Sequence, residues 1–292
     1  MGRAGPPPGP GAAGRGAGGG PGGGTRRGQG GVRGAGCGVT APVFVVGEAE
    51  EGAFRGAAPG SRFVLDGPEG RHAVSVKRLR AGEDVVLTDG AGRWAGAVVT
   101  DTEGKDRLVV SLDDGGVREE AAETPRITVV QALPKGDRGE LAVETMTETG
   151  VDAVVPWAAA RCITQWKGER GQKALSKWRA TAREAGKQSR RVRFPEVAEL
   201  ATTKQVAALL SGADFAAVLH EEGSEPLATA ALPGAGHIVL VVGPEGGVSP
   251  DELAAFAQAG AEPYRLGRSV LRTSTAGTAA TALLLGRSGR WS

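Results

Sequence analysis

The chain has 292 residues, which is long enough for two ordinary domains with a sizeable core. No apolar run approaches the ~20 residues that span a membrane, and the start of the chain lacks the apolar stretch of a secretory signal. We therefore predict a cytoplasmic protein without membrane contact. The two cysteines, Cys37 and Cys162, cannot form a disulfide framework or a metal-ligand cluster, so we predict no bound metal.

The net charge of +2 hides an uneven distribution of basic residues. Five arginines and no acid lie in residues 1–38, so that 30 of the 35 basic residues remain against 33 acids in the rest of the chain. Net charge therefore gives no argument for binding nucleic acid, and only local clustering can. The stretch from Arg161 to Arg193 is such a cluster, with eleven Lys or Arg and two acids.

The amino-terminal tail, residues 1–40, is predicted to be disordered. Residues 1–38 contain 18 of the 49 glycines and almost no large apolar side chains, so they cannot bury enough surface to offset the entropy lost on ordering. We favour an extension that does not fold over the alternative, an RNA-binding tail of the Arg/Gly type. We also expect the natural chain to start at Val39, read as methionine from a GTG codon, which would make the tail a gene-assignment extension.

Residues 41–118 are predicted to form a small β-barrel. Short β-branched or alternating segments, separated by turns that contain Gly, Pro and Asp, are typical of this architecture. The acidic segment 113–124 lacks periodicity, and we place the domain boundary there. The expected strands are 43–46, 62–65, 84–88, 93–99 and 107–112.

Residues 125–288 are predicted to form an α/β domain with a mostly parallel sheet, because apolar strands alternate with helical patterns. Ligands bind at the carboxyl ends of the strands in open sheets of this kind, so we expect the chemistry in the loops that follow them. The expected strands are 127–133, 153–156, 215–220, 238–242 and 264–266, and the expected helices are 137–149, 172–187, 203–211, 250–259 and 274–286.

The loop after the expected strand 238–242 has the most distinctive sequence, GPEGG at 243–247. Its glycines permit positive φ and a close approach of backbone to a ligand. Ser249 and Glu252 then predict a capping box, with Pro250 at the first helical position. An ordinary tight turn explains these residues equally well on their own. The motif is neither GxGxxG nor GxxxxGK[ST], so it does not support a dinucleotide or P-loop site.

A second polar loop, GRSVLRTSTA at 267–276, connects an apolar strand to an expected helix. Arg268 and Arg272 lie near the start of that helix, where they could bind an anion. Two exposed arginines are, taken alone, more often solvated than functional. Three neighbouring hydroxyl side chains are candidate helix caps: Thr273, Ser274 and Thr275.

Three loop sequences taken together resemble one family. In chain order, LHEE (219–222), VVGPEGGVSPDE (241–252) and LGRSVLRTSTA (266–276) are similar to the RsmE family of 16S ribosomal RNA uracil-N3-methyltransferases, members of the SPOUT superfamily. The resemblance extends to LPKGDRGELAVETMTETGVDAVVPWAAAR and KWRATAREAGKQSRRVRFPEV. RHAVSVKRLRAGEDVVLTDGAG resembles the PUA-like barrel of that family, so that residues 41–286 are covered.

The resemblance implies a SPOUT-type domain with a parallel sheet and a deep trefoil knot, preceded by the PUA-like barrel. It also implies a homodimer in which the helix 274–286 is buried. The implied reaction moves a methyl group from S-adenosylmethionine to N3 of a specific uridine in 16S ribosomal RNA of the small ribosomal subunit. Largely main-chain groups would bind the cofactor, at Leu219, His220, Glu221, Gly243, Pro244, Gly246, Gly247, Leu266, Gly267, Val270 and Leu271.

Two side chains are candidates for catalysis. Uracil N3 becomes nucleophilic only when its proton leaves, and an arginine can stabilise the anion on the flanking carbonyl oxygens. Arg272 is therefore the first candidate, and Glu245 is a candidate base or a brace for its loop. The sequence departs from the family at two positions, where a Lys is absent from the helix before Gly150 and Ser274 replaces the usual acid.

RNA binding is predicted for the Arg161–Arg193 cluster and the basic residues of the barrel. Phosphate contacts would supply salt-dependent affinity, and the target uracil must be unpaired or flipped out. The alternative for 172–187 is a solvated helix face. The residues that we name are Arg78, Arg80, Arg161, Lys187, Arg190 and Arg191, with Arg71 and Lys77 beside them.

Functions of other classes stay open. A nicotinamide-dependent oxidoreductase would need a glycine fingerprint after its first α/β strand, and LPKG at 133–136 is not one. A non-catalytic RNA-binding module is disfavoured because the GPEGG and LR loops are intact. A related enzyme could methylate a guanine or a ribose hydroxyl instead. Only the family resemblance separates these reactions from methylation of uracil N3.

Overall fold

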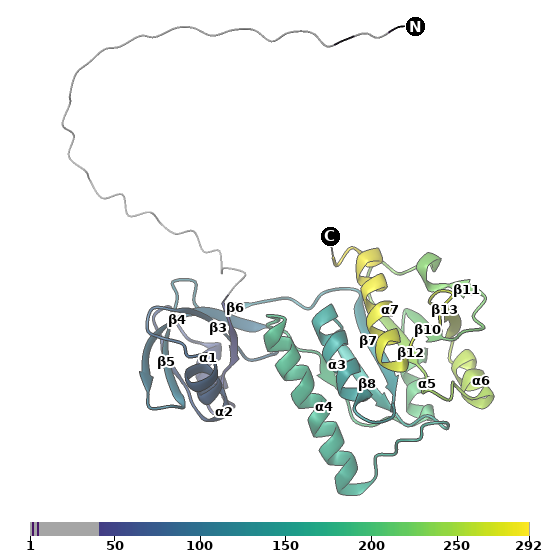
Figure 1. Cartoon of the computed structure of the whole chain (residues 1–292), viewed down its shortest axis with the longest axis horizontal. Helices are drawn as coiled ribbons and strands as arrows, with labels where there is room; N and C mark the ends of the chain where they lie inside the picture. Colours follow the sequence, from purple (N-terminus) through teal and green to yellow (C-terminus); the bar gives the residue numbers. More distant parts are fainter. Residues whose placement is uncertain (1, 3–4, 6–40, 292) are drawn as a thin grey trace, which may run out of the picture. The chain divides into compact units, whose positions relative to one another are not determined.

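The computed structural model describes residues 2, 5 and 41–291 (Figure 1). The tail predicted to be disordered and the expected start at Val39 therefore lie, apart from Gly2 and Gly5, outside the described residues. The described chain forms two sheets, one within residues 43–119 and one within 126–265, and each sheet has its own apolar core.

The first sheet contains all five strands that were predicted. Its strands follow the order β1-β3-β4-β5-β2, with β6 paired to β4, and only β1 and β3 pair in parallel. Alternate side chains, among them Phe44, Phe63, Leu87 and Leu108, face one buried core. The strands are β1 (Val43–Val45), β2 (Arg62–Leu65), β3 (Asp84–Thr88), β4 (Arg93–Glu103), β5 (Arg107–Leu112) and β6 (Arg118–Glu119).

Three short helical turns in this part were not predicted: α1 (Glu51–Arg55), α2 (Gly67–Arg71) and the π-helical turn η1 (His72–Val76). α2 contacts β2 and β5, and Glu69 of α2 accepts a hydrogen bond from the backbone N–H of Val45 in β1 (3.4 Å). A helix therefore links the two outer strands of the sheet. The Gly67-Pro68 pair indicated a turn. Proline is also common in the first turn of a helix, so the same pair is compatible with the helix observed.

The segment 113–124, in which the domain boundary was expected, contributes a strand to the first sheet. Within it, β6 pairs with β4, and the Arg118 guanidinium lies 4.8 Å from the centroid of the Trp94 ring. Arg118 also forms a salt bridge with Asp113 (3.4 Å). The second sheet then begins at Arg126, in β7.

The second sheet has seven strands in the order β11-β13-β10-β12-β7-β8-β9, and all of their pairings are parallel. The predicted parallel α/β fold is therefore confirmed. β9 and β11 have two residues each and were not predicted. The strands are β7 (Arg126–Ala132), β8 (Ala153–Trp157), β9 (Glu196–Val197), β10 (Phe215–Leu219), β11 (Glu225–Pro226), β12 (His237–Val242) and β13 (Glu262–Arg265).

Helices cover both faces of this sheet, which explains why its central strand β12 is apolar from Ile238 to Val242. In β12, Ile238, Leu240 and Val242 pack in the core that includes α3, α4 and α7, while Val239 and Val241 pack with α5 and α6 on the other face. Figure 1 shows α3, α4 and α7 together on one face. The helices are α3 (Arg138–Thr149), α4 (Gly168–Gln188), α5 (Thr203–Ser211), α6 (Pro250–Gln258) and α7 (Thr273–Ser288), with the 3₁₀ turn η2 at Leu227–Thr229.

The segment after α4 packs against the first sheet. The Thr88 hydroxyl donates to the carbonyl of Val192 (2.8 Å), and Ala91 forms a β-bridge with Arg193. The Phe194 ring occupies the space in which a Cβ at Gly90 would lie. No helix within residues 41–291 is long and apolar enough to cross a bilayer.

Candidate functional site

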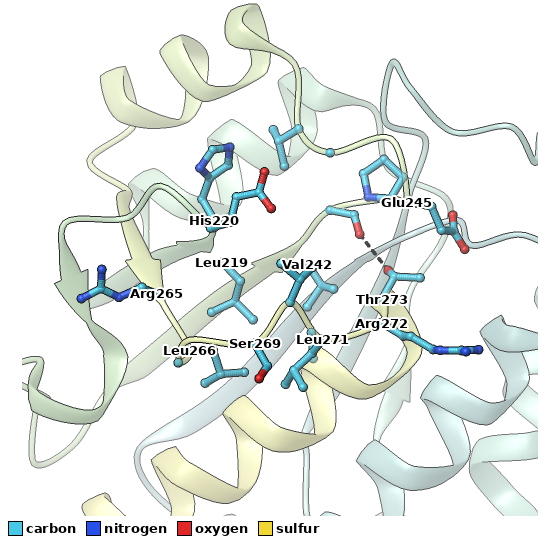
Figure 2. Close-up of a pocket in the computed structure, with 18 of the residues that line it drawn as sticks. Leu219, His220, Val242, Glu245, Arg265, Leu266, Ser269, Leu271, Arg272 and Thr273 are labelled. Carbon is cyan, nitrogen blue, oxygen red and sulfur yellow. Dashed lines mark hydrogen bonds between the residues drawn. The ribbon is translucent and has the colours of Figure 1, made fainter.

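The carboxyl ends of β10, β12 and β13 open into a cavity of about 1300 Å³ (Figure 2). The loops that follow these three strands line the cavity, as expected for an open parallel sheet. Both catalytic candidates, Glu245 and Arg272, lie at its border with them. All residues predicted to bind the cofactor line this one cavity: Leu219, His220, Glu221, Gly243, Pro244, Gly246, Gly247, Leu266, Gly267, Val270 and Leu271.

The GPEGG loop is a tight turn followed by a capped helix. The N–H of Gly247 donates to the carbonyl of Pro244 (2.9 Å), and Gly247 has φ +75°, which favours glycine. The predicted capping box is present, since the Ser249 hydroxyl accepts from the N–H of Glu252 (3.3 Å) and the Glu252 carboxylate accepts from the N–H of Ser249 (2.9 Å).

Glu252 also has partners that the capping box does not explain. This buried carboxylate accepts hydrogen bonds from the N–H of Ala160 (2.7 Å) and the hydroxyl of Thr203 (3.2 Å). Ala160 precedes Arg161, whose guanidinium donates to the carbonyl of Gly246 (3.0 Å). Glu252 therefore ties the loop after β8 to the GPEGG loop. The sequence signalled only its capping role, because the other partners are distant in the chain.

The loop after β13 leads into α7 by a different route from the one predicted. None of the three hydroxyl residues caps the helix. It begins at Thr273, and Arg272 is the N-cap residue, without a side-chain cap bond. The Thr273 hydroxyl instead donates to the carbonyl of Gly243 (2.7 Å), which is the dashed line in Figure 2. This bond joins the loop after β13 to the loop after β12.

His220 has a local structural role at the end of β10. The ring Nδ1 accepts a hydrogen bond from the backbone N–H of Glu222 (3.2 Å), and the backbone N–H of His220 donates to the carbonyl of Tyr264 in β13 (3.0 Å). The ring therefore stabilises the turn after β10. Burial, followed by the hydrogen bond to Glu262, raises the pKa of the nearby Tyr264.

The cavity has an apolar part and a polar part. Figure 2 shows Leu219, Val242, Leu266 and Leu271 grouped together, while Glu245 and Arg272 lie on the side away from His220 and Arg265. Glu245 accepts a hydrogen bond from the N–H of Lys135 (3.2 Å), so it braces the loop after β7. Its second carboxylate oxygen has no protein partner among residues 41–291.

The polar rim is rich in arginine. Five arginines line the cavity, against two carboxylates, Glu221 and Glu245, so that the rim favours anionic ligands. One of the five, Arg138 at the start of α3, was not among the predicted site residues, although it lies in the stretch from Leu133 that resembles the family. The other arginines are Arg161, Arg265, Arg268 and Arg272.

Two predicted RNA contacts are corrected by the structure. Lys187 is buried and donates to Glu69 (2.8 Å) and Glu184 (3.2 Å). The Arg191 guanidinium donates to three main-chain carbonyls, at Thr147, Val151 and Arg193. Burial lowers the pKa of Arg191. Both side chains therefore stabilise the fold, and charge counting missed this because it does not distinguish buried cations from exposed ones.

The other residues predicted to bind RNA are exposed. Arg78, Arg80, Arg161 and Arg190 lie at the surface, and Arg78 and Arg190 have positive φ values of 56° and 60°. In the cluster itself, some cations pair with acids and others do not. Lys177, Arg179 and Arg183 form salt bridges, whereas Lys167, Arg170, Lys173 and Arg190 have no side-chain partner in the described part of the chain.

No group of three or more His, Cys, Asp or Glu within the described ranges could hold a metal ion. Cys162 lies half-buried beside a smaller cavity of about 370 Å³. Burial raises the pKa of its thiol, so the thiol is protonated at neutral pH.

Comparisons with known proteins find relatives for both sheets of the chain. A profile of an RNA methyltransferase domain matches residues 122–285, and a profile of an RNA methyltransferase PUA domain matches residues 65–113. The ribosomal RNA small subunit methyltransferase E of Mycobacterium bovis is 44% identical over 243 residues, which cover 80% of this chain and 89% of that protein. The Bacillus subtilis protein of the same name is 28% identical over 222 residues, covering 73% and 86%.

Solved structures give the same relationship. The ribosomal RNA small subunit methyltransferase E of Neisseria gonorrhoeae, bound to S-adenosyl methionine, matches with a TM-score of 0.73 and 29% identity over 85% of this chain and 98% of that one. A Legionella pneumophila methyltransferase in complex with the same cofactor has a TM-score of 0.73, 26% identity and the same coverage. The chain belongs to the ribosomal RNA small subunit methyltransferase E family of RNA methyltransferases.

Proposed function

We propose that the chain transfers a methyl group from S-adenosylmethionine to N3 of a specific uridine in the 16S ribosomal RNA of the small subunit. One observation carries this proposal: three loops that are distant in sequence line one cavity, with Glu245 and Arg272 at its border. The proposed cofactor-binding residues fit the cofactor because apolar side chains and exposed backbone of the glycine-rich loops lie at the same cavity. The bound cofactor would supply an electrophilic methyl group on sulfur.

The chain's own residues would act on the uracil. The Arg272 guanidinium, at the rim, would stabilise negative charge on the carbonyl oxygens beside N3. Glu245 would accept the N3 proton through the oxygen that does not bind Lys135. Holding the two reactants in line would supply much of the acceleration.

RNA would approach over exposed cations. We propose Arg161 at the cavity rim, Arg190 after α4, and Arg78 and Arg80 of the PUA-like part as phosphate contacts. Arg161 donates only to the Gly246 carbonyl and the other three have no side-chain partner among residues 41–291, so all four can neutralise phosphates without breaking a native salt bridge. On this argument Lys167, Arg170 and Lys173 join the proposed surface.

The family also suggests an assembly and a topology. We propose a deep trefoil knot formed by the loops after β10, β12 and β13, a homodimer that buries α7, and a cytoplasmic location. Large apolar side chains exposed near the ends of α3 and α7 support an interface: Leu141 is 46% exposed, Val270 78% and Trp291 57%. Domain limits at 41–118 and 125–288 belong to the same proposal.

Mass spectrometry of 16S ribosomal RNA tests the reaction. RNA from a strain that lacks the gene should contain unmodified uridine where the parent strain contains 3-methyluridine, and the purified protein should restore the methyl group in the presence of S-adenosylmethionine. Restoration of a methylguanine or a 2′-O-methyl ribose instead would contradict the proposal.

A further inference from the structure

A buried chain of hydrogen bonds lies behind the cavity, at the carboxyl ends of the two central strands. Gln131 of β7 is the register partner of Val242 in β12 and is fully buried. Its Nε2 donates to the hydroxyl of Thr273 (3.1 Å), and Thr273 donates to the carbonyl of Gly243 (2.7 Å). The chain therefore connects β7, the start of α7 and the GPEGG loop.

Chemistry fixes the direction of each bond. The carbonyl of Gly243 can only accept, so the single hydroxyl hydrogen of Thr273 points to it. Thr273 must then accept from Gln131, which requires the amide nitrogen and not the oxygen. A second acceptor, the carbonyl of Ala132, lies 3.1 Å from the same nitrogen and demands the same orientation.

The bond to Gly243 acts on a peptide group that has few other restraints. Pro244 has no N–H, so the carbonyl is the only hydrogen-bonding group of the peptide between residues 243 and 244. Gly243 lacks a Cβ, which would otherwise restrict rotation of this peptide. The hydroxyl of Thr273 therefore sets the direction in which the GPEGG loop leaves β12.

The amide of Gln131 is only partly satisfied by the fold. Its Oε1 is buried and has no hydrogen-bond partner within residues 41–291. An unpaired buried acceptor lowers stability, and an apolar side chain of similar length would avoid this cost. A residue that is unfavourable for stability yet in contact with a cavity-lining side chain is typical of a functional role.

We infer that Gln131 and Thr273 are positioning residues that hold the GPEGG loop and the Arg272 loop in the geometry that binds the cofactor. This inference rests on the proposed function. Neither residue needs to touch the reacting atoms, because Thr273 acts through Gly243 on one side and through its neighbour Arg272 on the other.

The first test compares Thr273→Val with Thr273→Ser. Valine keeps the shape and removes the hydroxyl, so the affinity for S-adenosylmethionine measured by calorimetry should fall by about tenfold or more. Serine keeps the hydroxyl and should restore affinity to within about threefold of wild type. Equal affinities of wild type and Thr273→Val would overturn the inference, and so would equal losses in both variants.

Gln131→Met provides a second test that a purely structural role would not pass. Methionine removes the unpaired oxygen together with the two hydrogen bonds of Nε2, so the variant should unfold at a denaturant concentration close to that of wild type and yet bind the cofactor more weakly. Unchanged affinity, or a loss of affinity that follows a loss of stability, would contradict the inference.

Thr147→Val is the matched control, because the buried Thr147 hydroxyl bonds only to Val143 of its own helix (2.7 Å) and should not affect binding. If Thr273→Val does not fold, the affinity of Gln131→Met for S-adenosylmethionine, measured by calorimetry, tests the inference alone. Wild-type protein that does not bind the cofactor would instead refute the proposed function, which keeps the two failures distinct.

Discussion

Gly243 and Gly247 lie in the same loop but require glycine for different reasons. Gly247 has φ +75°, a conformation that side chains with a Cβ adopt only with strain, while the nearest atom to a Cβ there would be 3.7 Å away. A Cβ at Gly243 would lie 2.8 Å from Cγ2 of Val248, although Gly243 has no positive φ. Gly247 is therefore required by the backbone conformation, and Gly243 by the packing of Val248.

Gly243→Ala should therefore weaken cofactor binding by displacing Val248 and with it the GPEGG turn. We expect a loss of affinity of about tenfold, the lower part of the range for overpacking. Calorimetry with S-adenosylmethionine measures it. Adding Val248→Ala, which removes the clashing methyl group, should recover part of the affinity, and a double variant no better than Gly243→Ala alone would exclude this packing explanation.

Arg272→Lys should separate binding from catalysis. Lysine keeps the positive charge but not the planar array of donors, so single-turnover methylation should slow by about 100-fold. Cofactor affinity should stay close to wild type, because Arg272 is exposed and points away from the apolar part of the cavity. Arg268→Lys, in the same loop, is the matched control. A wild-type rate for Arg272→Lys would remove it from catalysis.

Local patterns predicted residues that line the cavity where the signal lies within one loop. The GPEGG glycines and the Ser249–Glu252 capping box need only neighbours in sequence, and the structure has both features. The bonds from Thr273 to Gly243, and from Ala160 to Glu252, join residues 30 and 92 positions apart. Such pairs follow from the packing of strands and helices, which no single segment encodes.

At the scale of elements, α4 presents both paired and unpaired cations. Lys177, Arg179 and Arg183 meet Glu140, Glu199 and Glu69, in the body of the helix. Unpaired cations lie at its start and just beyond its end. The charge of the helix is therefore not uniformly free, and the proposal of RNA binding is restricted to the cations without an acidic partner.

Charge reversal of Lys167, Arg170 and Lys173 together should weaken RNA binding and make it less dependent on salt. Each lost phosphate contact should reduce the slope of log affinity against log salt by about one. Filter binding to small-subunit RNA at several salt concentrations measures this slope, and cofactor affinity should not change. Lys204→Glu, an exposed reversal on α5, is the control. An unchanged slope in the triple variant would place the RNA elsewhere.

Element boundaries show where periodicity is informative. Strands buried on both faces and helices with a clear apolar side were predicted to within a few residues. The helical turns α1, α2 and η1 were missed, because five residues are too few to show a helical period. The two-residue strands β9 and β11 were missed for the same reason.

At the scale of the molecule, the connection between the two sheets depends on charged groups that are removed from solvent. Glu69 is 15% exposed and meets Lys187, 6% exposed, at 2.8 Å, with Arg183 at 3.4 Å. Two charges brought out of water stabilise a fold only when both are present. The contact therefore makes the position of α2 dependent on the end of α4.

Lys187→Met should lower the free energy of unfolding by about 2 kcal/mol, because Glu69 loses its shorter partner and keeps Arg183. Adding Glu69→Gln removes the remaining charge and should restore most of that loss. Urea denaturation measures both effects, with Lys173→Met as the exposed control on the same helix. Cofactor affinity should be unchanged in all three variants, since none of the substituted residues lines the cavity at the ends of β10, β12 and β13. If Lys187→Met were as stable as wild type but lost RNA affinity with a reduced salt slope, Lys187 would contact phosphate and its ion pair with Glu69 would not stabilise the fold.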